Sequence, residues 1–163
     1  MHASFRTQVI ISDTSCLIAL TNIGILDVLR QLYETVLVTP EVADEYGESL
    51  PEWIAIKAVV DAGKTIAFNR FIDLGESSAI ALAMETDEAL LVVDDLEARR
   101  FALSLGLKIT GTLGVLIRAF ERGIITDISA VISQLKETGF RLPANTDKII
   151  SSQLKVTRKK EQT

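Results

Sequence analysis

The chain has 163 residues, of which 48% are hydrophobic and 24% are charged, and its formal net charge at pH 7 is −5. This length favours one domain with a full hydrophobic core. The acidic balance excludes general affinity for polyanions, so nucleic acid has to be met by a local basic patch or by metal ions. No apolar run approaches the ~18 residues of a membrane span.

The chain has one cysteine and one histidine, and both limit the chemistry. Cys16 has no partner for an internal disulfide, which favours a reducing cytoplasm. It lies in an apolar stretch, so a buried small hydrophobe is favoured over a nucleophile. His2 lies near the terminus, which argues against histidine-based triads and zinc sites. The first seven residues lack the apolar core of a signal peptide.

Short apolar runs alternate with segments of helical periodicity along the chain. In order, the pattern predicts a strand at 9–12, a helix at 15–32 broken near 22–24, a strand at 36–38, a helix from 39, a strand at 53–56 and a short helix within 61–71. It then predicts a helix from 73, a strand at 90–93, a helix at 96–105, a strand at 107–110 and helices at 112–122, from 126 or 127 to before 139, and at 146–154. We expect a polar, mobile tail at 155–163 after a single domain at 1–154.

This alternation predicts an α/β fold with three layers, α/β/α, around a central parallel sheet of four to five strands. Two of the predicted strands are followed by acids, since Asp13 follows the first strand and Asp94 follows the run at 90–93. In an open parallel sheet, ligands bind outside the carboxyl ends of the strands. We therefore expect both carboxylates at one edge of the sheet.

Two helix acids, Glu45 and Glu76, complete a predicted cluster with Asp13 and Asp94. Like charges held close together repel and raise each other's pKa, so the cluster is unfavourable unless a cation fills it. Oxygen-only ligands suit a hard ion such as Mg²⁺ or Mn²⁺. The residues alone therefore predict a metal-dependent hydrolase of phosphate esters.

The strand-end acids also have a purely structural explanation. Asp13, Thr14 or Ser15 can cap the helix that follows the first strand. Asp94 can cap the helix that begins at 96, and Asp95 can be a first-turn acid favoured by the helix dipole. Two such acids in one sheet are harder to explain by capping than one.

The remaining candidates have structural explanations as well. Glutamates on amphipathic helices usually face solvent, which applies to Glu45, and first-turn acids such as Glu76 are common for dipole reasons. The turn at 111–114 lacks the lysine and spacing of a phosphate loop, so Thr112 is predicted to cap a helix near the acids. Basic side chains in the second half can face the pocket and bind phosphates; they are Arg99, Arg100, Lys108, Arg118 and Arg122.

Four segments together resemble the PIN domain superfamily, and most closely small prokaryotic PIN proteins related to VapC-type toxins. They are ISDTSCLIAL, VTPEVADEY, LGESSAIALA and LLVVDDLEARRFALSLGLKITGTLGVL, between residue 9 and about residue 125. The resemblance implies an α/β/α fold with a central parallel sheet and a Mg²⁺- or Mn²⁺-dependent ribonuclease. Toxin members of this branch cut RNA, are held silent by a cognate antitoxin, and often form dimers.

Position by position, the resemblance implies that four acids hold the metal and carry catalysis. They are Asp13, Glu45, Glu76 and Asp94, and many toxin relatives carry aspartate where this chain has Glu76. Glu41 is the second candidate for the helix acid. All four positions are filled, so nothing marks the chain as an inactive member.

Further residues are implied in supporting roles. Asp95 is adjacent to Asp94 and is a possible further metal ligand. Thr14 or Ser15 would support Asp13, and Thr112 matches a threonine or serine often found near the pocket.

The predicted function is cleavage of RNA by the toxin of a toxin–antitoxin pair, with an antitoxin protein and a second copy of the chain as partners. One alternative is a catalytically silent PIN-fold module that binds or regulates a partner. Another is a phosphatase of the haloacid dehalogenase kind, which also has an aspartate after its first strand. That chemistry needs a second aspartate where this chain has Ser15, and a lysine that Lys108 is not well placed to supply.

Overall fold

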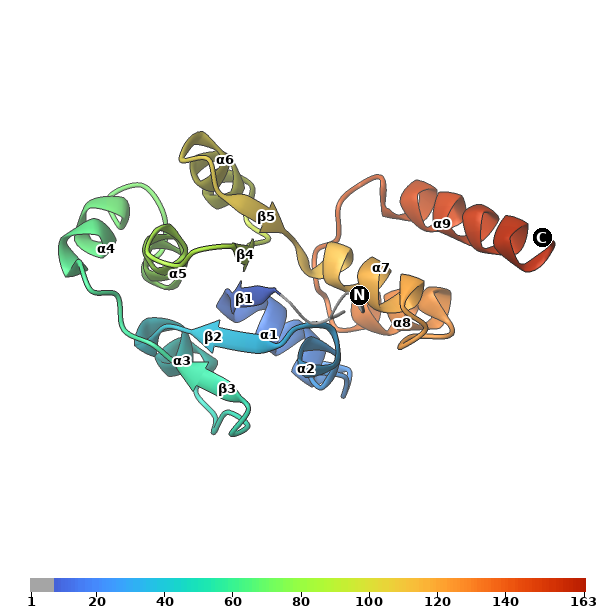
Figure 1. The fold of residues 1–163 in the computed structure, drawn as a ribbon, viewed down its shortest axis with the longest axis horizontal. Helices are drawn as coiled ribbons and strands as arrows, with labels where there is room; N and C mark the ends of the chain where they lie inside the picture. Colours follow the sequence, from blue (N-terminus) through green and yellow to red (C-terminus); the bar gives the residue numbers. More distant parts are fainter. Residues whose placement is uncertain (1–7) are drawn as a thin grey trace, which may run out of the picture.

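The structure is a computed structural model, and it describes residues 8–163. The expectations for residues 1–7, including His2, lie outside this part. In chain order the elements are β1 (Val9–Ser12), α1 (Thr14–Asn22), α2 (Val28–Leu32), β2 (Thr35–Val38), α3 (Pro40–Tyr46), β3 (Ile54–Ile56), α4 (Ala62–Phe68), α5 (Leu74–Met84), β4 (Ala89–Val92), α6 (Leu96–Ser104), β5 (Lys108–Thr110), α7 (Thr112–Glu121), α8 (Ile128–Glu137) and α9 (Thr146–Glu161) (Figure 1).

The five strands form one parallel sheet in the order β3-β2-β1-β4-β5. From β1 the chain first builds outward through β2 and β3, and then returns to place β4 on the other side of β1. The strand order thus reverses between β1 and β4. In open α/β sheets the crevice beyond the carboxyl ends of two such strands is the usual ligand site.

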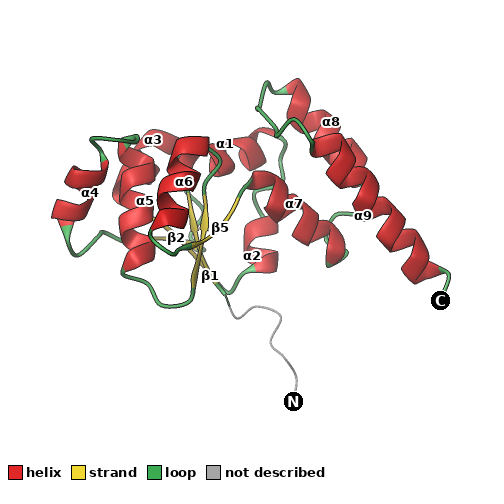
Figure 2. Ribbon diagram, turned by 90° about the horizontal axis from the view of Figure 1, so that it is seen from above, coloured by secondary structure: helices red, strands yellow, loops and turns green. Residues whose placement is uncertain are grey.

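Side chains alternate along the strands between two hydrophobic cores, because successive residues of a strand face opposite sides of a sheet. Ile10 and Val92 belong to a core with α1, α2, α7 and α8. Ile11 and Leu91 belong to the other core, with α5 and α6. All four side chains are fully buried. Figure 2 shows the sheet between these groups of helices, which confirms the predicted three-layer α/β/α fold.

Helix boundaries follow local signals at most predicted positions. Thr39 caps α3 by accepting a hydrogen bond of 3.2 Å from the backbone N–H of Val42, and Pro40 follows as the first helical residue. The predicted break after α1 is present, with Gly24 at a φ of 75°. Asp127, one of the two predicted caps, caps α8 by accepting from Ala130.

The last helix differs from the prediction. It continues from Thr146 to Glu161, whereas the sequence predicted an end at Leu154. Most of the added residues are polar lysine, arginine and glutamate, which favour helices, and Arg158, Lys159 and Lys160 lie in the last turn, where the helix dipole favours cations. The mobility of residues 155–163 stays a prediction. No helix in residues 8–163 has the length and apolar character needed to cross a membrane.

Candidate active site

Two aspartates meet where the strand order reverses. Asp13 follows β1, and Asp94 lies just beyond β4. The Oδ2 atom of Asp13 accepts a hydrogen bond of 3.1 Å from the backbone N–H of Asp94, and its Oδ1 atom accepts one of 2.9 Å from that of Cys16. Asp13 is also 2% exposed. The structure therefore brings the two strand-end acids together across adjacent strands.

The start of α7 holds the carboxylate of Asp94. Its Oδ1 atom accepts a hydrogen bond of 2.8 Å from the backbone N–H of Thr112, and its Oδ2 atom accepts one of 2.6 Å from the Thr112 hydroxyl. A Cβ atom at Gly111 would stand 2.9 Å from Asp94 Oδ1, so a side chain at this position would displace the Asp94 carboxylate. The cap of α7 is Gly111, and the prediction of Thr112 as the cap was wrong, because its side chain binds Asp94 instead.

Glu45 reaches from α3 to the N-terminus of α5. Its Oε1 atom accepts a hydrogen bond of 2.9 Å from the backbone N–H of Gly75, and its Oε2 atom accepts one of 2.6 Å from the Thr14 hydroxyl. A Cβ atom at Gly75 would stand 2.5 to 2.7 Å from this carboxylate, so the contact requires glycine. Thr14 thus supports Glu45, whereas the sequence suggested support for Asp13. These two contacts go to Glu45 and not to Glu41.

Four carboxylates at this edge each bind the N-terminus of a different helix. Asp13 binds α1, Glu45 binds α5, Asp95 binds α6 and Asp94 binds α7. Asp95, rather than Asp94, is the cap of α6, and it accepts a hydrogen bond of 3.0 Å from the backbone N–H of Ala98. The first N–H groups of a helix have no partner within the helix, and the helix dipole is positive there. The helix ends therefore offset part of the repulsion among the acids.

Negative charge at this edge remains in excess. Burial and the neighbouring Asp94 carboxylate raise the pKa of Asp13 to about 8, against two backbone hydrogen bonds that lower it. Burial, Asp95 and Asp73 raise the pKa of Glu76 to about 7. Near neutral pH the site therefore holds protons that a cation can displace.

A cleft of about 640 Å³ opens beside these acids, and we name it the acidic cleft. Its acidic lining residues are Asp73, Glu76, Asp94 and Asp95, and Ser15 also lines it. Asp13 is buried at the base of the cluster and Glu45 lies beside Gly75, so neither forms the cleft wall. Within the cleft, Glu76 and Asp94 are the half-buried acids, and Asp73 and Asp95 are exposed.

Cys16 takes no part in this chemistry. It is fully buried, and burial, followed by the charges of Asp13 and Asp94, raises the pKa of its thiol well above its usual range. A thiol that stays protonated is a poor nucleophile and metal ligand. The prediction of a small buried hydrophobe is confirmed.

The acids of the site have the donor chemistry of a divalent-cation site but not yet its geometry. Among residues 8–163, no three His, Cys, Asp or Glu side chains are arranged to hold a metal ion as they stand. The chemistry fits a hard cation, because the donors are carboxylate oxygens and a cation relieves the repulsion that raises the pKa of Asp13. Asp13 and Asp94 are already adjacent, so a third carboxylate has to turn toward this pair.

Sequence reasoning missed two residues at the rim of the acidic cleft. Phe140 and Arg141 line it from residues 138–145, the segment between α8 and α9 that we name the connecting loop. The sequence signal for this site is an aromatic residue followed by an arginine, directly after the glycine that ends α8. Nothing in local periodicity shows that this loop returns to the carboxyl edge of the sheet.

Comparison with known families agrees with this arrangement. The chain matches the family DUF3368, described as a PIN domain, over residues 9–155. The match covers most of the chain, so the protein belongs to this PIN-domain family. No curated protein matches the chain. The predicted resemblance to PIN domains, which are generally nucleases, is confirmed.

The raised pKa of Asp13 predicts an unusual pH dependence of stability. Because the folded protein keeps this proton up to about pH 8 while the unfolded chain loses it near its ordinary pKa of 3.8, the contribution of Asp13 to stability is greatest below pH 4 and is lost as the pH rises toward 8. In EDTA, the wild type should lose on the order of 3 kcal/mol more unfolding free energy between pH 5 and 8 than Asp13→Asn.

Urea unfolding at several pH values measures this difference. The matched control is Asp127→Asn, which changes the exposed cap of α8 and should keep the pH dependence of the wild type. Parallel curves for the wild type and Asp13→Asn would show that Asp13 is not held protonated.

The Gly75–Glu45 contact gives a second prediction. Gly75→Ala should displace the Glu45 carboxylate, because the new Cβ atom takes its place, while unfolding free energy changes by less than about 1 kcal/mol, since alanine favours helices. Gly63→Ala is the control, because Gly63 is likewise the second residue of a helix but a Cβ there meets only Asp61. A crystal structure of Gly75→Ala with Glu45 unmoved would contradict the contact.

Proposed function

We propose that this PIN-domain protein is a Mg²⁺- or Mn²⁺-dependent endoribonuclease that prefers single-stranded RNA. The observation that carries the proposal is the pair of Asp13 and Asp94. One hydrogen bond joins the two residues where the strand order reverses, and burial together with the negative charge of Asp94 raises the pKa of Asp13. Membership of the PIN-domain family supports hydrolysis of phosphodiester bonds as the reaction.

Most of the carboxylates would bind metal, and one has a second possible role. Asp13, Glu76 and Asp94 would bind one or two ions, with Asp95 as a further ligand. A bound ion supplies a water of lowered pKa and stabilises charge on the phosphate. Glu45 would hold a second ion or orient the attacking water as general base.

The protein fixes this arrangement before substrate binds. Thr112 binds both oxygens of Asp94, and Thr14 with Gly75 binds both oxygens of Glu45, so neither carboxylate rotates freely. Glu76 lines the acidic cleft, where it would be the third carboxylate to bind an ion beside Asp13 and Asp94. Asp94 and Glu45 are therefore preorganised, whereas a third carboxylate has to turn toward Asp13 and Asp94 to complete a metal site.

We further propose that the protein acts in the cytoplasm as a homodimeric toxin restrained by an antitoxin. Its resemblance to VapC-type toxins supports this role. Several large apolar side chains are exposed, among them Phe71 at 72% and Leu96 at 69%, and a partner protein or a second copy can cover them. The single cysteine fits a reducing compartment.

One observation favours the alternative of a silent binding module. Asp13, Glu45, Asp94 and Asp95 already serve as partners of helix N-termini, a role that needs no catalysis. RNA cleavage and partner binding distinguish the two functions. A silent module cleaves no RNA in Mg²⁺ or Mn²⁺ and binds its partner regardless of the acids.

Cleavage of labelled single-stranded RNA tests the nuclease directly. Asp13→Asn and Asp94→Asn should each lower the rate in Mg²⁺ by about 100-fold or more, because each removes a ligand that would hold the ion. EDTA should abolish cleavage of the wild type, and added Mg²⁺ or Mn²⁺ should restore it. Asp44→Asn, an exposed change on the same helix as Glu45, is the control. Full activity in Asp13→Asn would refute the site.

Growth of bacteria that express the chain alone tests the toxin role. Wild-type protein should arrest growth, and Asp13→Asn at equal abundance should not, because arrest requires RNA cleavage. Arrest should be relieved by a small protein encoded next to the gene. Unimpaired growth with an actively cleaving wild type would exclude the toxin role and leave the nuclease standing.

A further inference from the structure

The connecting loop lies between two cavities that share four residues. Asp94, Leu96, Phe140 and Arg141 line the acidic cleft and also a second cavity of about 790 Å³, which we name the apolar groove. The groove runs along α7 toward α9. Its apolar wall includes Ile109, Leu113, Ile117, Leu142, Pro143 and Ile149. The two cavities therefore lie side by side at Asp94, one of the paired acids of the candidate active site.

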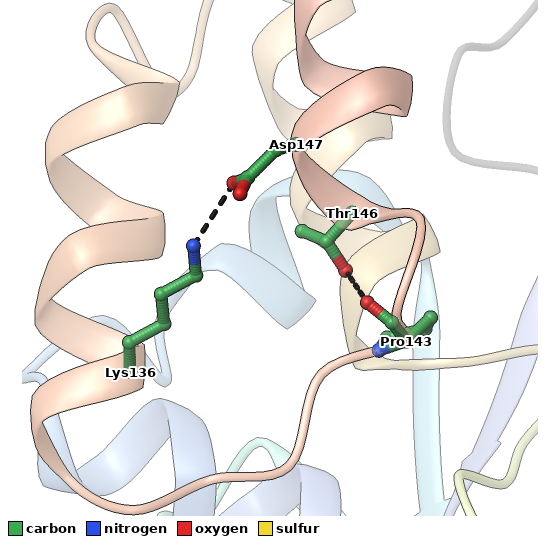
Figure 3. A network of polar contacts seen from close by, with 4 residues as sticks. All are labelled: Lys136, Pro143, Thr146 and Asp147. Atoms are coloured by element: carbon green, nitrogen blue, oxygen red, sulfur yellow. Dashed lines mark hydrogen bonds and ion pairs between the residues drawn. The ribbon is translucent and has the colours of Figure 1, made fainter.

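Polar contacts brace the connecting loop at both ends, as Figure 3 shows. The Lys136 ammonium of α8 lies 2.9 Å from the Asp147 carboxylate of α9. The Thr146 hydroxyl donates a hydrogen bond of 2.5 Å to the carbonyl oxygen of Pro143, and the backbone N–H of Thr146 donates to the same oxygen at 3.1 Å. The ion pair is exposed and adds little stability. Of these contacts, the two from Thr146 to Pro143 bind the loop itself, and the ion pair joins the helices on either side of it.

Arg141 is the cation at this junction. It is exposed, and it is the one basic residue that the described part of the chain contributes to the wall of the acidic cleft. Within residues 8–163 it makes no ion pair with an acid. Arg99 also lines the apolar groove, but its guanidinium already donates a hydrogen bond of 2.7 Å to the carbonyl oxygen of Val93. Arg141 is thus the guanidinium available to an anionic ligand beside Asp94.

The groove and the arginine together match one chemical class. A nucleotide has an apolar, planar base and a phosphate, and proteins bind unpaired bases on aromatic and apolar surfaces and phosphates on arginine. Phe140 and the apolar wall offer the first surface, and Arg141 offers the second. A pocket of several hundred Å³ is of the size that holds a small ligand or a nucleotide.

We propose that the connecting loop and the apolar groove form a nucleotide-binding subsite next to the cleavage position. Arg141 binds the phosphate that neighbours the scissile one, and the base of that nucleotide enters the groove against Phe140. The subsite rests on the proposed nuclease function, because its place relative to the scissile bond is set by Asp94. It makes residues 138–145 the part of the chain that selects substrate.

Binding of RNA separates this proposal from the catalytic one. The protein carries Asp13→Asn so that RNA is not consumed, and a fluorescent single-stranded RNA serves as the probe, followed by anisotropy. Arg141→Gln should weaken binding by about 10-fold, and it should lower the slope of log affinity against log salt by about 0.7, the value for one lost contact to a single strand. Arg141→Lys should bind between the two.

Two more variants complete the experiment. Phe140→Ala should weaken binding by about 5-fold or more, through lost stacking, without changing the salt slope. Arg70→Gln is the control, because it removes the same charge from an exposed position outside both cavities and should bind as the parent protein does. Because Phe140 packs partly against the core, its variant is compared only after thermal unfolding shows an intact fold.

The outcomes distinguish the two proposals. If Arg141→Gln weakens RNA binding while the wild type cleaves no RNA, nucleotide binding by Arg141 stands, but the nuclease function and the placement of the subsite beside a scissile bond fail. If the wild type cleaves RNA but Arg141→Gln and Phe140→Ala bind it as Arg70→Gln does, the subsite is overturned and the nuclease stands. The second result is also the one expected if the groove instead receives an apolar segment of a partner protein.

Discussion

The carboxylate of Asp13 accepts two hydrogen bonds, one from Cys16 in the helix that Asp13 caps and one from Asp94 just beyond the neighbouring strand β4. Both donors are backbone N–H groups, so the position of the carboxylate is set by the fold rather than by side-chain rotamers. The parallel order of β1 and β4 makes this possible, because it brings both strand ends to one edge. The remaining acids are arranged around this pair.

Helix N-termini reduce the repulsion among these carboxylates but do not cancel their negative charge. Each backbone N–H that binds a carboxylate favours its charged form, yet burial and mutual repulsion outweigh this effect at Asp13 and Glu76. The fold therefore leaves negative charge at this edge uncompensated, and Asp13 and Glu76 bind protons when no cation is present. Glycines at positions 75 and 111 are part of the same arrangement, because a side chain at either would collide with a carboxylate.

The sequence was most informative where local chemistry decides structure. Alternating apolar runs predicted every strand, and the signals at Thr39 and Pro40 predicted the start of α3. The sequence was least informative about which side chains bind each other. The binding of Thr14 to Glu45 joins residues 31 positions apart, and whether Asp94 or Asp95 caps α6 depends on where the backbone turns after β4.

Two other misses have different physical reasons. Polarity suggested a tail after Leu154, but Lys, Arg, Glu and Gln favour helices, so polarity alone does not end one. The role of Phe140 and Arg141 at the acidic cleft depends on how α8 and α9 pack at one end of the sheet (Figure 1), which no local pattern in residues 138–145 encodes. The acidic side chains of the cleft were thus visible in the sequence, whereas its lining residues from the connecting loop were not.

Calorimetric titration of the metal-free protein with Mn²⁺ at pH 7, in two buffers of different ionisation enthalpy, tests the central claim most directly. Because Asp13 and Glu76 hold protons in the absence of a cation, binding should release about one proton or more per protein, and the measured enthalpy should differ between the buffers accordingly. Absence of Mn²⁺ binding, or binding with the same enthalpy in both buffers, would contradict the account.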